Sequence, residues 1–368
     1  MRIGNIVRRT LVGALAAILS GWIAYADSPR LYWVGTFGGS SSEALGVSAN
    51  GTVVGWSFTA NGQRRGLIWT RDSGIRVLDT LGGNISEAYG ISRDGNIVVG
   101  YSNTPDLRSR AVRWESSNQT MEDLGAASPA QARGISADGS VIVGQTNGVP
   151  FRWTQATGVQ PLSGIPTGWL GNALSTSADG AVVVGFVRPP STSFRAFLWR
   201  DGVLQILPTL QSGSNAFGIA ADVSDDARIA VGQANTLSGS TRAVRWVDGA
   251  IEELGTLGGN SQALGVSANG RRIVGSSLHL PSTQERAFLW TESNGMIDLN
   301  EAYASLLPAG ARLIRATDIS ADGRYIVGIG INPETGRQEG FLLDTIPEPT
   351  SMLMLSAGLA GLILRRRG

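Results

Sequence analysis

Few residue types in this chain could do chemistry. The only histidine, His279, lies in the segment SSLHLPST, and the chain contains no cysteine. A catalytic triad or a zinc site needs further ligands or a partner base around the first imidazole. Because no second histidine exists, we interpret His279 as a solvated loop residue. The lack of cysteine also excludes disulfides, thiolate metal sites and cysteine nucleophiles.

The acidic segment ADVSDDA at 221–227 brings several carboxylates together in sequence. Calcium prefers a shell of carboxylate and carbonyl oxygens, so the calcium candidates are Asp222, Asp225 and Asp226. The segment lacks the spacing and the final glutamate of an EF-hand loop, which favours a solvated turn. We therefore predict no catalytic residue and no cofactor.

The elements that must position any site come from a sequence that repeats seven times between the two ends. LGGNISEAYGISRDGNIVVG at 81–100 is very similar to LGGNSQALGVSANGRRIVG at 257–275. Each copy has a turn pair, a β-rich run that ends in glycine and a second run that ends in tryptophan. The turn pairs are Asn50-Gly51, Asp94-Gly95, Asp138-Gly139, Asp179-Gly180, Asp226-Ala227, Asn269-Gly270 and Asp322-Gly323. The tryptophans are Trp69, Trp114, Trp153, Trp199, Trp246 and Trp290, with Leu343 in the last copy.

A period of about 44 residues with several short strands per copy is typical of a β-propeller. Each copy divides into four strands, and the turn pair predicts a tight hairpin with positive φ at both central residues. Leu31 to Thr36 aligns with the fourth strand of other copies, whereas the last copy ends after its third strand. We predict an all-β, seven-bladed β-propeller of four-stranded blades at residues 27–345, closed by the N-terminal strand. An open solenoid is the structural alternative.

One face of the first strand carries small residues, which suit the innermost strands of a radial array. The alanines on this face are Ala44, Ala88, Ala132, Ala173, Ala216, Ala263 and Ala316. Two residues later come Gly46, Gly90, Gly134, Ser175, Gly218, Gly265 and Asp318. Asp318 breaks the pattern, and together with Arg133 it is the sequence's only hint of a catalytic centre.

The tryptophans separate into two groups. Those at the end of the third strand hold a fixed place in the repeat, which predicts packing between blades. Trp33, Trp56 and Trp169 fall outside that place and are better candidates for an exposed contact, for example stacking on a sugar.

The N-terminus has the layout of a secretory signal peptide over residues 1–26. Arginines precede an apolar stretch, and Ala24-Tyr25-Ala26 forms an A-x-A cleavage site, with Ala24 and Ala26 at the positions that signal peptidase reads. We predict a signal helix that is removed on export. An uncleaved membrane anchor is the alternative.

The C-terminal segment 346–368 reads IPEPTSMLMLSAGLAGLILRRRG. Its notable residues are Pro347, Glu348 and Pro349 before the apolar run and Arg365, Arg366 and Arg367 after it. The run is shorter than the about 20 residues of a typical spanning helix, but a basic cluster behind it stays on the cytoplasmic side. We therefore predict a C-terminal transmembrane helix, with a plain single-span anchor as one alternative.

This C-terminal segment closely resembles the PEP-CTERM sorting signal of Gram-negative bacteria. The resemblance implies recognition by an exosortase, which is a membrane peptidase, and cleavage near Pro-Glu-Pro. The chain would then be held in the membrane only transiently. The logic is that of other removable C-terminal signals, in which the final product has no transmembrane helix.

The repeats are similar to a second family. The pattern LGTLGG-N-S-x-A-x-G-[IV]-S-x-[DN]-G-x-x-VG, followed by RAFLW, resembles the HAF repeats of bacterial extracellular proteins. The first, second and sixth copies match it best, whereas the third lacks LGG and the fifth has an insertion around Asp222 to Asp225. This resemblance implies an extracellular setting and little about activity.

The charge balance argues against nucleic acid as a partner. All 30 basic residues are arginine, and six of them lie in the two ends. The other 24 arginines are outnumbered by the 29 acidic residues of the whole chain, so the body is mildly acidic. Nucleic-acid binding requires clustered positive charge.

These features predict a non-catalytic propeller that is exported and delivered to the cell surface or the extracellular polysaccharide matrix. The implied partners are signal peptidase, exosortase and matrix polysaccharide, and the implied role is structural or glycan-binding. The alternative is a carbohydrate-active propeller enzyme, similar to a sialidase or a lyase, which would need acids, bases or arginines converging near the axis.

Overall fold

The computed structural model describes residues 28–118 and 120–345. The described residues from Leu31 onwards form one compact unit, which we call the body. The predicted signal helix at 1–26 and the predicted transmembrane segment at 346–368 lie outside the described residues. Within the described ranges, no helix is long and apolar enough to cross a membrane.

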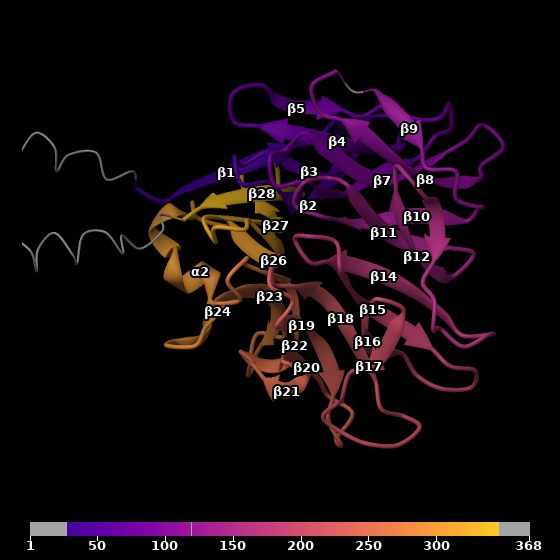
Figure 1. Cartoon of the computed structure of the whole chain (residues 1–368). Coiled ribbons are helices and arrows are strands. Elements are labelled where there is room, and N and C mark those ends of the chain that lie inside the picture. Colours follow the sequence, from indigo (N-terminus) through magenta and orange to yellow (C-terminus); the bar gives the residue numbers. More distant parts are fainter. Residues whose placement is uncertain (1–27, 119, 346–368) are drawn as a thin grey trace, which may run out of the picture. The chain divides into compact units, whose positions relative to one another are not determined.

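The body is built almost entirely from antiparallel strands that follow one another in chain order (Figure 1). The first strands of the seven repeats are β2 (Gly38–Val47), β6 (Ser86–Ile91), β10 (Ala130–Ile135), β14 (Leu170–Thr176), β18 (Gly218–Val223), β22 (Gly258–Val266) and β26 (Arg312–Ile319). The second strands are β3 (Val53–Thr59), β7 (Ile97–Asn103), β11 (Val141–Thr146), β15 (Val182–Arg188), β19 (Ile229–Asn235), β23 (Arg272–His279) and β27 (Tyr325–Asn332).

The outer half of each repeat follows the same scheme. The third strands are β4 (Arg64–Thr70), β8 (Ser109–Glu115), β12 (Val149–Thr154), β16 (Arg195–Arg200), β20 (Thr241–Val247), β24 (Gln284–Thr291) and β28 (Arg337–Asp344). The fourth strands are β5 (Gly74–Val77), β9 (Met121–Asp123), β13 (Gly158–Pro161), β17 (Val203–Ile206), β21 (Ala250–Glu253) and β25 (Gly295–Asp298). A short helix, α2 (Leu299–Ala302), and a 3-10 turn, η1 (Ala304–Leu306), connect β25 to β26.

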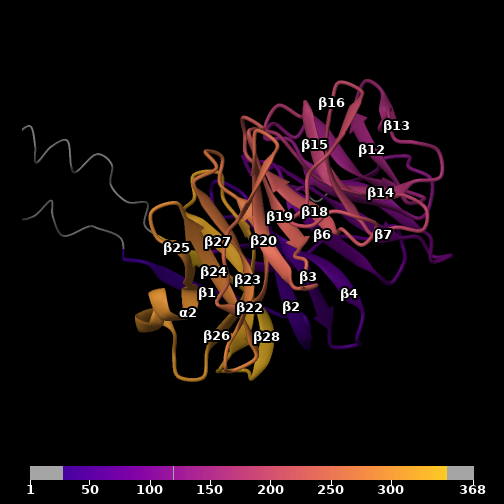
Figure 2. The same ribbon diagram turned by 90° about the horizontal axis from the view of Figure 1, so that it is seen from below.

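Repeats two to six each form a separate four-stranded sheet. The first and last repeats are joined in one eight-stranded sheet, with the order β26-β27-β28-β2-β3-β4-β5 and with β1 (Arg30–Gly35) also paired to β28. The link between β28 and β2 is a parallel pair, Ser41 with Gln338. Figure 2 shows the same succession of sheets from below.

The hairpin between the first and second strands differs from the predicted two-residue turn. Only the second residue of the pair has positive φ, at 77° for Gly139 and 59° for Ala227, and the preceding aspartate does not. The reason is a serine that the turn prediction ignored. Ser136 Oγ donates to Asp138 Oδ1 at 2.7 Å and accepts from Val141 N at 2.9 Å, so the loop is a longer turn built around a buried hydroxyl. All seven repeats contain this arrangement, with the serines Ser48, Ser92, Ser136, Ser177, Ser224, Ser267 and Ser320.

A β-bulge interrupts the first strand of every repeat immediately after an alanine. Opposite that alanine, the second strand has a glycine, as in the pair Ala132 and Gly144. A Cβ on Gly144 would lie 2.0 Å from Gln131 O, so no side chain fits there. This close approach explains why the second-strand run contains a glycine in every copy.

The structure corrects the alignment of the fifth repeat. Ala220, and not Ala216, pairs with the second-strand glycine Gly232. The residue two positions later is therefore Asp222, and not Gly218. Because of the insertion, the sequence alignment chose an alanine and glycine that lie four residues too early in this repeat. As a result, two repeats and not one carry an aspartate after the bulge.

The core lies between neighbouring sheets, where side chains of two repeats interdigitate. One cluster joins Val54 and Ile68 of the first repeat to Val98 and Trp114 of the second. Five of the six third-strand tryptophans are buried, and Trp199 is half-buried. Trp114 Nε1 donates to the connector carbonyl of Asp79 at 3.1 Å, so this ring both packs against and hydrogen-bonds to the preceding repeat.

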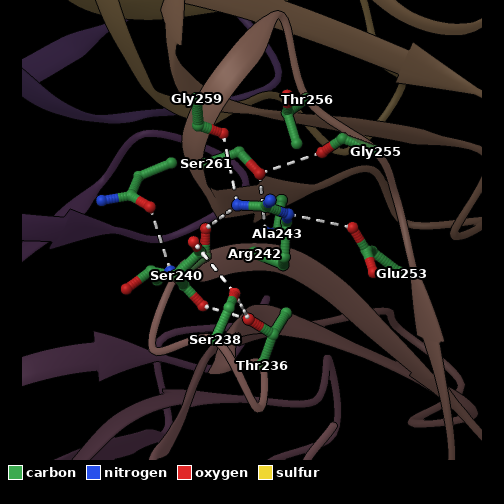
Figure 3. A network of polar contacts seen from close by, with 12 residues as sticks. Thr236, Ser238, Ser240, Arg242, Ala243, Glu253, Gly255, Thr256, Gly259 and Ser261 are labelled. Atoms are coloured by element: carbon green, nitrogen blue, oxygen red, sulfur yellow. Dashed lines mark hydrogen bonds and ion pairs between the residues drawn. The ribbon is translucent and has the colours of Figure 1, made fainter.

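Polar contacts also link consecutive sheets. Ser261 Oγ, at the start of β22, accepts from Ala243 N of β20 at 2.9 Å and donates to Gly255 O at 2.9 Å (Figure 3). Beside it, Arg242 forms an ion pair with Glu253 at 3.1 Å. A single hydroxyl of the sixth repeat thus satisfies one donor and one acceptor of the backbone that precedes it.

Candidate ligand site in the central cavity

The first strands of all seven repeats surround one cavity of about 230 Å³. A second hollow of about 350 Å³ adjoins it. Seven residues, one from the β-bulge of each repeat, line both spaces. A bulge re-aims the side chain of the extra residue, and here that residue faces the cavity in every repeat. These residues, which we call the bulge ring, are Leu45, Tyr89, Arg133, Leu174, Ala221, Leu264 and Thr317.

Two adjacent members of the bulge ring form its most polar part. The Arg133 guanidinium lies over the Tyr89 ring, 3.8 Å from its centroid, and Arg133 donates to Gln131 Oε1 at 2.7 Å. Arg133 Nε is buried and has no hydrogen-bond partner. The Tyr89 hydroxyl donates to Glu87 Oε2 at 2.8 Å. Burial raises the pKa of Tyr89, so this phenol stays protonated and acts as a donor.

Two ion pairs lie beside Tyr89 and Arg133. Glu87 accepts from Arg64 at 2.5 Å, and Arg64 lies over the Trp56 ring at 4.2 Å. Arg315 of the last repeat donates to Glu43 of the first at 2.7 Å. The carboxylates near the hollow are therefore already paired, whereas no carboxylate of the described residues forms an ion pair with Arg133.

Two carboxyl groups lie deeper in the cavity. Asp222 accepts from Ser175 Oγ at 2.6 Å and from Val266 N at 2.8 Å. Asp318 accepts from Val47 N at 2.9 Å. Both face the cavity, so part of their surface is open to a water-sized probe although protein surrounds them.

Burial favours the protonated form of both carboxyls. Burial, reinforced by the negative charge of Asp222, raises the pKa of Asp318 to about 8. The pKa of Asp222 is raised as well, mainly by burial. At neutral pH the pair therefore holds at least one proton, and each carboxyl accepts a backbone N–H from another repeat.

An ion pair between distant repeats lies at the other side of the cavity. Arg93 of the second repeat donates to both carboxylate oxygens of Asp225 in the fifth, at 2.6 and 2.5 Å. A series of backbone bonds surrounds it, in which an amide of one repeat donates to the carbonyl at the matching position of the next, as from Ala49 N to Arg93 O at 3.0 Å. These contacts narrow that side, whereas the hollow near Arg133 remains open.

The structure does not bring the three calcium candidates to one point. Asp222 faces the cavity, Asp225 pairs with Arg93, and Asp226 accepts from Ser224 Oγ within its own turn. Hydrogen bonding by that hydroxyl lowers the pKa of Asp226.

One group of the described residues has metal-ligand geometry, namely His279 with Asp298 and Glu301. Asp298 is already engaged by Arg286 and by the backbone of Asn300. A neighbouring guanidinium disfavours a cation there, so a solvated His279 remains our interpretation.

The remaining site predictions have different outcomes. Arg133 and Asp318, which broke the sequence pattern, both line the cavity. Trp33 and Trp169 are half-buried against core clusters, whereas Trp56 lies under Arg64. The processing residues Ala24, Ala26, Pro347, Glu348, Pro349, Arg365, Arg366 and Arg367 lie outside the described residues.

Sequence comparison decides the role of the C-terminus. Residues 345–367 match the PEP-CTERM protein-sorting motif. The PEP-CTERM motif implies export and sorting by an exosortase, to the cell surface or beyond it. No curated protein matches the sequence of this chain. The resemblance of the repeats to HAF repeats remains a prediction.

Comparison of structures identifies the fold. The body is similar to the β-propeller domain of the Trilobed protease from Pyrococcus furiosus, with a TM-score of 0.55 and 12% identity over 86% of this chain and 96% of that one. An acylaminoacyl peptidase from Pyrococcus horikoshii gives a TM-score of 0.54 at 12% identity, over 88% of this chain and 55% of that one. A puromycin-hydrolyzing peptidase from Mycobacterium tuberculosis gives 0.53 at 14% identity, over 83% and 53%. The chain spans about half the length of these two peptidases, and at such identities the likeness shows a propeller-like fold alone.

Proposed function

We propose that this protein is an exported, non-catalytic β-propeller that binds a ligand at its central cavity outside the cell. The observation that carries the proposal is the PEP-CTERM motif at 345–367 behind a propeller-like body. Signal peptidase removes residues 1–26, the C-terminal segment holds the chain in the inner membrane transiently, and an exosortase cleaves near Pro-Glu-Pro. The mature body then reaches the outer cell surface or the extracellular polysaccharide matrix.

We further propose that the body is a closed ring of seven blades. The bond from Gly66 N to Ser86 Oγ, at 3.0 Å, joins the first repeat to the second. The equivalent bond from Gly340 N to Ser42 Oγ, also at 3.0 Å, joins the seventh repeat to the first. The same contact that links consecutive repeats thus links the last to the first, and β1 supplies the fourth strand that the seventh repeat lacks.

Core packing supports the same interpretation. One buried cluster contains Val53 and Leu67 of the first repeat together with Val327 and Leu342 of the last, and Val34 of β1. Closure hides the apolar faces that an open array would expose at its two ends. The propeller domain of the Trilobed protease, by contrast, is described as having an open velcro topology.

The non-catalytic role rests on what the cavity groups contact. Asp222 and Asp318 each accept a backbone N–H of the following repeat, Val266 N and Val47 N. Such bonds occupy the carboxyls in holding strands together. The hollow near the bulge ring is open and carries mixed polar and apolar side chains, which suits binding.

Sorting is tested by expressing the full chain in a host with and without the exosortase and measuring the mass of the product. We expect the last 20-odd residues to be lost only when the peptidase is present. An intact tail in both hosts would rule the sorting out. As a control, Pro347→Ala with Pro349→Ala should retain the tail in either host.

A carbohydrate-active enzyme is the second candidate, because two carboxyls with raised pKa in one cavity resemble a general acid and its partner. Glycan hits should then be followed for turnover by wild-type protein and by Asp222→Asn. Multiple turnover that is lost in the variant would replace the non-catalytic proposal.

A further inference from the structure

The seven members of the bulge ring differ from one another in chemistry. Its members occupy equivalent backbone positions and face one cavity, yet only Tyr89, Arg133 and Thr317 carry polar atoms. Packing between repeats does not require this variety, because Ala221 and Leu264 occupy the same position equally well. The differences therefore point to recognition of a ligand.

The charges around the bulge ring indicate that the ligand is negatively charged. Arg64 and Arg315 are neutralised by Glu87 and Glu43. Arg133, in contrast, contacts only an amide oxygen and an aromatic face, and its Nε–H is buried without an acceptor. A buried donor without a partner is unfavourable, so this side chain is not fully satisfied by the protein alone. A ligand carboxylate in the hollow would pair with the Arg133 guanidinium, whose charge no carboxylate of the described residues neutralises.

The rest of the ring identifies the ligand's shape. Leu174 follows Arg133 in the ring, and Leu45 precedes Tyr89. The Thr317 hydroxyl donates to Ala44 O at 2.6 Å and is already occupied. The other ring members, Leu45, Leu174, Ala221 and Leu264, add an apolar surface beside Arg133, which suits the C–H face of a sugar ring.

From these observations we propose that the hollow binds a sugar acid, with its carboxylate on Arg133 and its ring against the leucines of the bulge ring. This inference rests on the proposed extracellular binding role and names the ligand class for that site. The stacking of Arg133 on Tyr89 holds the guanidinium plane in place, so little side-chain freedom is lost on binding. Gln262 at the rim provides a further polar group for sugar hydroxyls.

The experiment is calorimetry on the full chain in mild detergent, with digalacturonic acid and the neutral disaccharide of galactose as paired probes. We expect the acidic disaccharide to bind at least about tenfold more tightly than the neutral one, because a charge-assisted bond is lost in the latter. Equal affinity for the two probes, or no binding of either to folded protein, would overturn the proposal. So would tighter binding of a triglutamate peptide, which would point to a protein ligand.

Two variants test whether Arg133 causes the preference for the acidic probe. Arg133→Gln should reduce the preference for the acidic probe about tenfold or more. Arg245→Gln is the matched control, since Arg245 also lies over an aromatic ring, that of Trp290 at 4.6 Å, but is already paired with Glu252 outside the cavity. An unchanged preference in Arg133→Gln contradicts the proposal. Tail removal by the exosortase is measured separately, so a failure here is distinguishable from a failure of sorting.

Discussion

Two positions only three residues apart, one in the first strand and one in the turn that follows it, behave in opposite ways. At the turn, every repeat has a serine whose hydroxyl is bonded to an aspartate or asparagine, as Ser48 is to Asn50. At the bulge, the residue changes from leucine to tyrosine, arginine, alanine or threonine. The same backbone carries both positions, so the difference reflects what each side chain contacts.

The turn serine is buried and accepts a backbone N–H at the start of the second strand, so folding fixes its identity. The bulge residue faces a cavity, where the fold tolerates several shapes. Identity between repeats within this chain thus marks structural constraint, and variation at an enclosed position marks the candidate site. The following predictions test this contrast, from the largest expected effect to the smallest.

The second-strand glycine opposite the bulge should be the least tolerant position. In Gly144→Ala the new Cβ would collide with Gln131 O at 2.0 Å, so we expect a loss of about 3 kcal/mol or more in the free energy of unfolding. Gly66→Ala is the control, because its Cβ would meet Leu78 at an ordinary 3.4 Å. Urea unfolding measures both, and similar midpoints would show that the close approach does not constrain the fold.

The second-largest loss of stability is expected when the turn hydroxyl is removed. Ser136→Ala leaves the buried Val141 N–H without its acceptor, which should cost about 1–3 kcal/mol. The control Ser140→Ala removes an exposed hydroxyl that bonds to the same Asp138 carboxylate, and it should cost less than about 0.5 kcal/mol. If the two variants unfold at the same urea concentration, the turn serine has no special role.

The third prediction concerns pH. The pKa of Asp318 is about 8 in the fold and about 4 in an unfolded chain. Between these values only the folded state holds the proton, so raising the pH from 4 to 8 lowers the stability of the wild type. Asp318→Asn cannot ionise and should lose part of this dependence, so its melting temperature relative to wild type should rise by about 2–4 °C from pH 5 to pH 9. A constant difference across this range would mean that Asp318 titrates normally.

The smallest effect is expected in the bulge ring. Leu45→Thr and Arg133→Gln should each change the free energy of unfolding by no more than about 1 kcal/mol, because the ring already accommodates threonine and polar side chains. Thermal unfolding of the two variants beside Ser136→Ala gives the comparison directly. Losses as large as that of the serine variant would make the ring structural.

Much of the architecture could be predicted from sequence because it depends on repeated local signals. The glycine runs and the fixed place of Trp114 and its equivalents indicated short antiparallel strands packed on their neighbours. The bulge could not be predicted, because strict alternation is assumed for a strand and the extra residue leaves no signature of its own. Asp222 was named only as a calcium candidate, because the insertion in its repeat hid its equivalence to Asp318, which strand pairing reveals.

The site was predictable only in part. Arg133 and Asp318 attracted attention as exceptions to a pattern, and both line the cavity. Their partners belong to other repeats. The contact between Arg93 and Asp225 joins residues 132 positions apart, and no local signal in the sequence reports it.

Closure of the ring is the claim on which the cavity, the bulge ring and the proposed ligand all depend. The natural chain has no cysteine, so Ser41→Cys with Gln338→Cys places two thiols on paired residues of β2 and β28. We expect mild oxidation of the folded protein to join them, as seen by a faster-moving band without reducing agent and by the cross-linked peptide in mass spectrometry. Ser41→Cys with Gln284→Cys, which places the second thiol on another sheet, should remain reduced. A folded protein in which the first pair also stays reduced would contradict the closed ring.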